Sequence, residues 1–234
     1  MQIRDDATVR TEEYQSFLTY SGLSEDQLDV LNVFDTPHFD AGVLEGYDGL
    51  FVGGASEASV LEPEQYPFVV PAIALLQYCL RESIPVFASC FGFQLAILAL
   101  GGDIIRDRDN YEMGTPLLSL SKAATDDVLF KTITKAFPAV SVHRERASAL
   151  PMGCELLAYT DACPHAFKVT DKPFWAFQFH PEVDRATLVE RLTTYKSTYT
   201  EDDRQLNEVL ASAVVTPESN KLLKHFVEQV LCQT

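Results

Sequence analysis

One strand-turn-helix segment, Pro85–Gly102, constrains the fold of this chain more than any other part of the sequence. An apolar strand runs to Ala88, and an apolar helix begins at Phe91. Cys90 lies at the turn between them. A reactive side chain at such a turn needs small residues two positions before and after it, so that the strand and the helix can pass closely. Ala88 and Gly92 meet this requirement, so the segment predicts a nucleophile elbow at Cys90.

The same alternation of short apolar strands and helices occurs earlier in the chain. Leu28–Val33 is typical of a strand, Gly49–Gly54 of a buried strand ending in a glycine turn, and Phe68–Glu82 of a helix. Continuous apolar strands alternating with helices indicate a parallel sheet that is covered on both faces. We therefore predict an α/β fold with a doubly wound, mostly parallel sheet flanked by helices. Only Met1–Ile3 is available for a first strand, which we expect to be a stub or truncated.

The C-terminal part of the chain has a helical pattern. Leucines recur at helical spacing in Arg185–Tyr195 and Asp202–Ser212, and Pro217 begins a last helix. We predict one domain over residues 1–184 and a helical C-terminal tail over residues 185–234, packed on the same domain.

Composition excludes several classes of function. Thirty-four acidic residues against 18 basic ones give a formal charge of −16, which argues against binding a nucleic-acid backbone. No apolar stretch reaches the roughly 18 residues that a membrane helix needs. The five cysteines are an odd number without a C-x-x-C pair, so we expect neither a disulfide framework nor a zinc site. These features indicate a cytoplasmic protein.

A base and a carboxylate follow another apolar strand, Phe174–Phe179. In an extended segment, residues two apart project to the same side, and Pro181 prevents a helix there. Glu182 could then orient the imidazole of His180, which would take and return a proton. Alone, this sequence is as consistent with a plain turn. Together with an elbow cysteine it predicts acyl transfer through a covalent intermediate.

Backbone donors for an oxyanion are predicted beside Cys90. The elbow places the thiol at a helix N-terminus, which favours a thiolate, and turns the N–H group of Phe91 toward the reacting carbon. The glycine turn supplies a second donor, which we assign to Gly54. The alternatives are a buried structural cysteine and a simple turn at the end of a strand.

Three separated motifs of the chain resemble the signatures of class I glutamine amidotransferase domains. They are Gly53-Gly54, Ser89-Cys90-Phe-Gly92-Phe-Gln94 and Phe177-Gln-Phe-His180-Pro-Glu182, in the family's order and spacing. The resemblance covers roughly residues 1–185. It is greatest to free-standing chains similar to the amidotransferase half of GMP synthase, a group that includes γ-glutamyl peptidases. It implies a flavodoxin-like three-layer fold and a catalytic triad of Cys90, His180 and Glu182.

The resemblance also implies where the amino-acid end of a glutamine or γ-glutamyl group binds. It assigns this role to Gly53, Gln94, His143 and Glu145. The family often has Ser-His-x-Asp where this chain has Val-His143-Arg-Glu145. This departure concerns the identity of the γ-glutamyl substrate and leaves the triad intact.

Some other residues receive no chemical role from the sequence. Tyr111-Glu112-Met-Gly resembles a family element, for which packing is the better interpretation. His38, His165 and His225 have no paired ligand at metal spacing, so we expect them at the surface or in the core. We therefore expect no metal site and no organic cofactor.

The function that follows is hydrolysis of a γ-glutamyl amide, which with glutamine yields glutamate and ammonia. The chain would either deliver ammonia to a separate synthetase partner or act alone as a γ-glutamyl peptidase or hydrolase. A non-catalytic protein on the same scaffold is a further alternative, which the intact triad disfavours. A PfpI-like arrangement is disfavoured because Phe91, rather than histidine, follows the cysteine. A homo-oligomer is compatible with these observations.

Overall fold

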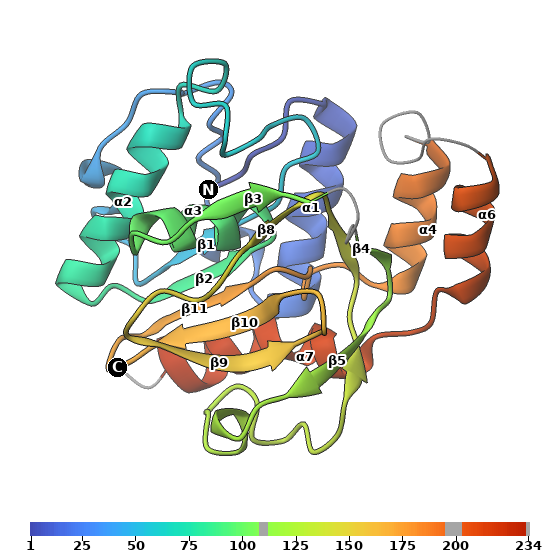
Figure 1. Ribbon diagram of the computed structural model, residues 1–234. Coiled ribbons are helices and arrows are strands. Elements are labelled where there is room, and N and C mark those ends of the chain that lie inside the picture. The colour runs from blue at the N-terminus through green and yellow to red at the C-terminus, as the bar shows by residue number, and fades with distance from the viewer. Residues whose placement is uncertain (108–111, 195–202, 233–234) are drawn as a thin grey trace.

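A central sheet with helices on both faces forms the body of the molecule (Figure 1). The computed structural model describes residues 1–107, 112–194 and 203–232. Within them the sheet has seven strands, in the spatial order β1 (Leu50–Val52), β2 (Val86–Ser89), β11 (Phe174–Phe177), β10 (Pro164–Val169), β9 (Cys154–Tyr159), β5 (Leu117–Leu120) and β6 (Phe137–Pro138). The helices are α1 (Ala7–Ser21), α2 (Val69–Glu82), α3 (Phe91–Ala99), α4 (Arg185–Thr194), α6 (Asp203–Ser212) and α7 (Pro217–Phe226). Short helical turns are η1 (Glu25–Gln27), η2 (Ala41–Leu44), η3 (Ala123–Thr125) and η4 (Val227–Leu231). The predicted α/β class, with a sheet between helical layers, is confirmed.

The parallel strands β1, β2 and β11 bring distant parts of the chain together. Val86 at the start of β2 is in register with Leu50 of β1 on one side and Phe174 of β11 on the other. Parallel strands end at the same edge of a sheet. The turn at Cys90, after β2, and the segment leading to His180, after β11, therefore lie at one edge.

The rest of the sheet is antiparallel. Strands β11, β10, β9, β5 and β6 pair antiparallel with their neighbours. Only four residues separate β9 from β10, and four separate β10 from β11, which is too short for the crossover that parallel strands need. The predicted mostly parallel sheet is thus parallel where it carries the candidate site and antiparallel beyond β11. Two small sheets, β3 (Ile104–Arg106) with β8 (Glu145–Ala147) and β4 (Glu112–Gly114) with β7 (Ser141–His143), complete the described strands.

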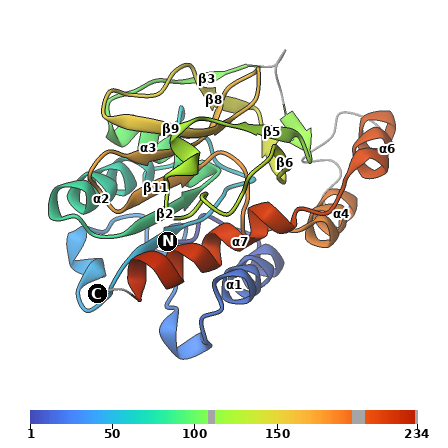
Figure 2. The same ribbon diagram turned by 90° about the horizontal axis from the view of Figure 1, so that it is seen from below.

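Alternating side chains of the central strands build two cores, one on each face of the sheet. In β2, Ala88 packs toward α2 and α3, whereas Phe87 packs toward α1 and α7. In β11, Ala176 and Phe177 alternate in the same way. Figure 2 shows α1 and α7 side by side on the face opposite α2 and α3. This two-faced burial explains why both strands are apolar at nearly every position.

The N-terminal segment pairs only briefly. Gln2 forms a single parallel bridge with Asn32, and the Met1 carbonyl accepts a hydrogen bond from the Gly53 N–H at 3.1 Å. The stub predicted at the N-terminus is therefore present as one bridge beside β1. The strand predicted over Leu28–Val33 is wrong in extent, because its pairing is limited to that bridge.

The C-terminal helices pack in two places. Apolar residues of α4 and α6 form a small core with Val140 and Val183. Helix α7 instead joins the main core, where Phe226 contacts the rings of Phe87 and Trp175. The predicted helices correspond to α4 and α6, although Tyr195 and Asp202 lie outside the described residues. None of the helices in the described part of the chain is long and apolar enough to cross a membrane.

Candidate active site

Cys90 occupies a strained turn between β2 and α3. Its backbone has φ +51° and ψ −98°, a region that non-glycine residues rarely adopt. Its N–H donates to the Phe177 carbonyl of β11 at 2.7 Å. A Cβ at Gly92 would lie 2.8 Å from Cγ1 and 2.9 Å from the carbonyl oxygen of Val52, so only glycine fits there. The sharp turn expected around Cys90 is therefore present.

His180 and Glu182 form a buried pair at the same edge of the sheet. The Nδ1 atom of His180 lies 2.6 Å from Oε1 of Glu182, and the two residues are 5% and 0% exposed. The backbone N–H of His180 donates to the Val140 carbonyl at 2.8 Å, which fixes the segment. The arrangement holds the imidazole in one orientation, with Nε2 left for another partner.

The charges of this group influence the imidazole strongly. Burial alone would lower the pKa of His180, but the charges of the Cys90 thiolate and Glu182, and its hydrogen bonds to both, raise it to about 10. Sγ of Cys90 also lies 3.9 Å from the Val142 carbonyl oxygen. A thiolate beside an imidazolium is the charge state that attacks a carbonyl and then protonates a departing nitrogen. The three residues predicted as a triad thus lie together, and their catalytic roles stay predictions.

The two predicted oxyanion donors flank Cys90. Helix α3 begins at Phe91, whose N–H therefore has no acceptor within the helix. A Cβ built on Gly54 would lie 2.7 Å from Cε1 of His180 and 3.5 Å from Cβ of Cys90, so Gly54 adjoins both. The N–H of Gly53 donates to Met1, and its carbonyl accepts from Gly92 at 3.3 Å. Gly53 therefore holds the turn through its backbone.

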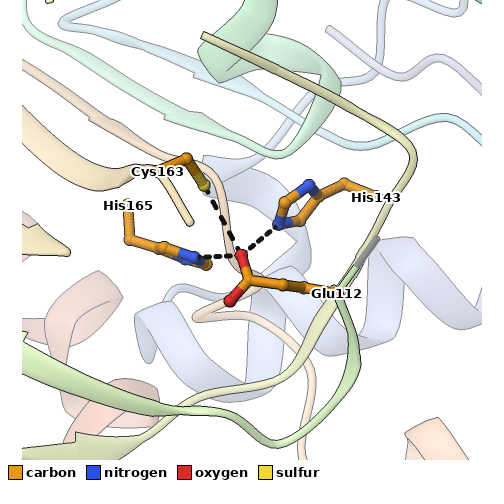
Figure 3. Close-up of side chains that lie close together, drawn as sticks. All are labelled: Glu112, His143, Cys163 and His165. Carbon is orange, nitrogen blue, oxygen red and sulfur yellow. Dashed lines mark hydrogen bonds and ion pairs between the residues drawn. The ribbon is translucent and has the colours of Figure 1, made fainter. Parts of the chain in front are cut away.

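The residues assigned to the substrate loop already have partners within the protein. Nε2 of Gln94 donates to the Glu145 backbone carbonyl at 3.0 Å. The Glu145 carboxylate accepts from Oγ of Ser59 at 2.7 Å and Nη2 of Arg106 at 2.8 Å. His143 directs its ring toward Glu112 (Figure 3). Gln94 and Glu145 therefore join α3 to β8, and the partners of Glu145 offset its charge.

A pocket opens beside His180. Its walls come from the Ala55–Ser56 turn, from Val140 and Val142, and from α4. The side chain of Arg4 lies at one side of it. The pocket provides space next to the imidazole that would protonate a leaving group.

Comparison with known proteins identifies the family. The model of the family "Glutamine amidotransferase class-I" matches residues 27–193. The chain belongs to this family. The match includes the turn at Cys90 and the His180–Glu182 pair.

Relatives of this amidotransferase domain include glutamine-hydrolyzing GMP synthases. One of the GMP synthase subunits of Methanocaldococcus jannaschii is 33% identical over 121 residues, which are 50% of this chain and 61% of that protein. The GMP synthase of Dehalococcoides mccartyi is 33% identical over 149 residues, which are 64% of this chain and 26% of that protein. The match thus spans less than two thirds of each relative.

Solved structures share the fold. A glutamine amidotransferase from Thermotoga maritima superposes with a TM-score of 0.72 at 19% identity, covering 93% of this chain and 91% of the other. A glutamine amido transferase from Methylobacillus flagellatus superposes with a TM-score of 0.69 at 18% identity, covering 97% and 91%. Both coverages extend over C-terminal helices, so this architecture is not specific to the present chain.

A buried polar cluster of this amidotransferase was not predicted from the sequence. Glu112, His143, Cys163 and His165 converge from three strands and one turn (Figure 3). Burial would raise the pKa of Glu112, but hydrogen bonds with the two histidines outweigh it and lower that pKa. Burial is the main cause that raises the pKa of the Cys163 thiol. The packing role expected for Glu112 is therefore incomplete, while Tyr111 lies outside the described residues. His38 is exposed and His225 half-buried, as expected.

A buried ion pair below the glycine turn also escaped prediction. Nε of Arg4 lies 2.8 Å from Oε1 of Glu13, and both side chains are 2% exposed. Arg4 donates to Oγ of Ser56 at 2.7 Å as well. A Cβ at Gly53 would lie 2.9 Å from Oε1 of Glu13, and one at Gly54 would lie 3.0 Å from Nη2 of Arg4. The pair therefore supports the turn from within.

A Gly54→Ala substitution is expected to lower glutamine hydrolysis by roughly 10²- to 10³-fold, because the added methyl group would displace His180 or the turn. Initial rates measured together with the melting temperature will separate this effect from unfolding. Gly42→Ala is the control, since its Cβ meets only Oδ1 of Asp40, at 3.0 Å. Equal rates in the two variants would contradict the placement of Gly54.

A Glu182→Gln substitution is expected to lower the free energy of unfolding at pH 7 by on the order of 3 kcal/mol, because it leaves a buried imidazolium unpaired. Burial raises the pKa of Glu182, but the charge of His180 outweighs burial and lowers it. The stabilisation by Glu182 is therefore present above the unfolded-state pKa of about 4.3 and is lost as pH falls through the lower folded-state pKa. Urea unfolding from pH 7 to pH 3 should show the difference between wild type and variant narrowing. A constant difference would refute this.

Proposed function

We propose that this chain hydrolyses the γ-amide of glutamine through a thioester on Cys90. The observation that carries the proposal is the convergence of Cys90, on its strained turn, with the buried His180–Glu182 pair at the same sheet edge. Membership of the class I glutamine amidotransferase family supports it, as does the glutamine-hydrolysing activity in the names of relatives.

The reaction proceeds in two halves. The Cys90 thiolate attacks the amide carbon, and the N–H groups of Phe91 and Gly54 stabilise the negative oxygen of the tetrahedral intermediate. The C–N bond then breaks as His180 gives its proton to the departing nitrogen, which leaves as ammonia. Water adds to the thioester while His180 takes one of its protons, and the C–S bond breaks. Glutamate leaves, and the thiolate and imidazolium are restored.

The ammonia is proposed to serve a separate synthetase partner. One relative is named as a single lettered component of a GMP synthase, which indicates that another component completes that enzyme. The alternative is cleavage of γ-glutamyl peptides without a partner. A comparison of ammonia release from glutamine with amino-acid release from γ-glutamyl dipeptides, on the isolated chain, decides between these uses. Efficient dipeptide cleavage with slow glutamine turnover would overturn the glutaminase proposal.

The nucleophile is tested by a glutamine-mimicking chloroketone or diazoketone, followed by peptide mapping. The expected result is one label per chain, on Cys90, with protection by glutamine. Burial raises the pKa of Cys79 to about 12 and that of Cys154 to about 11, so neither thiol should react at neutral pH. Labelling of Cys79 or Cys163 in preference to Cys90, or no labelling, would refute the assignment.

A further inference from the structure

The polar cluster of Glu112, His143, Cys163 and His165 lies outside the Cys90, His180 and Glu182 group. Glu112 lies opposite His143 in the β4–β7 pair, while His165 belongs to β10 and Cys163 directly precedes that strand. One potential ligand atom from each residue lies within 4.8 Å of all the others. Figure 3 shows the four side chains pointing toward one another.

The distances within the cluster are close to those of a coordination shell. Around Oε2 of Glu112 lie Nε2 of His165 at 2.7 Å, Nε2 of His143 at 3.2 Å and Sγ of Cys163 at 3.5 Å. Metal–ligand bonds of about 2.0–2.3 Å at tetrahedral angles place neighbouring ligand atoms roughly 3.3–3.7 Å apart. Shifts of well under 1 Å would therefore open space for an ion between the four atoms.

Burial and bonding indicate that the protein alone satisfies these groups incompletely. The side chains of His143 and His165 are 1% and 0% exposed, and that of Glu112 is 14% exposed. Despite its short contact with Glu112, Nε2 of His143 makes no hydrogen bond of regular geometry among the described residues. This buried nitrogen points into the cluster. Buried polar atoms without partners are unusual, and metal coordination is one way to satisfy them.

The donor set selects the kind of ion. Two imidazole nitrogens, one sulfur and one carboxylate oxygen suit Zn²⁺, whereas Mg²⁺ and Ca²⁺ prefer oxygen alone. A divalent cation also offsets the two negative charges of a carboxylate and a thiolate. With four protein ligands the shell is complete, as in structural zinc sites.

We propose that Glu112, His143, Cys163 and His165 form a structural site for Zn²⁺ or a similar borderline divalent cation. The ion would tie the small β4–β7 sheet to β10 of the main sheet. Strand β7 also carries Val142, whose carbonyl lies beside the Cys90 thiol. The site would thus hold one wall of the active site while taking no part in the reaction. Sequence spacing did not indicate it because the ligands come from separate strands.

Metal binding to the full chain, after removal of metals with a chelator, tests the site. Zn²⁺ affinity is measured in competition with a chromophoric chelator, and Co²⁺ serves as a spectroscopic probe. The expected result is one ion per chain, with a thiolate-to-cobalt charge-transfer band and the intense visible absorption of tetrahedral Co²⁺. Cobalt bound without the thiolate band, or no stoichiometric binding, would overturn the proposal.

Variants locate the ion. Cys163→Ser should abolish the charge-transfer band, and both Cys163→Ser and His165→Gln should weaken Zn²⁺ binding by at least about 100-fold. Cys154→Ser is the matched control, because this half-buried thiol lies outside the cluster. Cys90→Ser should bind Zn²⁺ with unchanged affinity. Binding that is lost in Cys90→Ser and retained in Cys163→Ser would place the ion at the catalytic thiol and refute the proposal. The wild-type cobalt spectrum is decisive even if a cluster variant does not fold.

Discussion

Replacing Cys90 with serine is expected to lower the rate of glutamine hydrolysis by at least about 10⁴-fold, since the nucleophile of a triad carries most of its rate enhancement. A serine hydroxyl at this turn would keep the geometry but would rarely be ionised beside His180. The measurement is steady-state ammonia release with purified wild type and variant. The variant should fold normally, because the replacement is nearly isosteric.

Cys154→Ser is the matched control for this experiment. It also exchanges sulfur for oxygen, but at a thiol that burial keeps protonated at neutral pH by raising its pKa to about 11. Its rate should equal that of the wild type. Full turnover in Cys90→Ser would show that another group performs the chemistry.

A Glu13→Gln substitution is expected to cost about 3–5 kcal/mol of unfolding free energy, because it leaves the buried Arg4 guanidinium without its carboxylate. For a chain of this length that corresponds to a fall in melting temperature on the order of 10 °C. Hydrolysis should also decrease, since the pair supports the Gly53–Gly54 turn. Calorimetry or thermal circular dichroism will measure the change in stability.

An exposed ion pair provides the control for this second prediction. Arg204 and Glu208 are separated by the same 2.8 Å, but their side chains are 87% and 64% exposed. Solvent screening limits such pairs, so Glu208→Gln should change stability by less than about 0.5 kcal/mol. Similar losses in the two variants would mean that burial of Arg4 and Glu13 is not the source of the effect.

The parts of the site predicted from the sequence were those determined by local backbone chemistry. The small residues around Cys90 indicate a sharp turn, and Pro181 fixes the spacing of His180 and Glu182. Strand apolarity then indicates that the two segments meet in one sheet. These inferences need no knowledge of side-chain partners, which explains their agreement with the structure.

The parts that were missed depend on contacts between segments distant in sequence. Arg4 lies in a polar N-terminal run, and only the fold shows that Glu13 reaches it. Glu112 and His165 are 53 positions apart and meet through different sheets. The antiparallel pairing beyond β11 likewise follows from loop lengths that apolar periodicity does not specify.

The parallel pairing of β2 with β11 has a consequence for how activity is acquired. Cys90 and His180 are separated by a large part of the domain, so the thiol has no base until the strand that precedes His180 has paired. Contacts between such distant residues form slowly, because a long loop must close first. During refolding from denaturant, recovery of hydrolysis should therefore lag behind helix formation and report completion of the sheet.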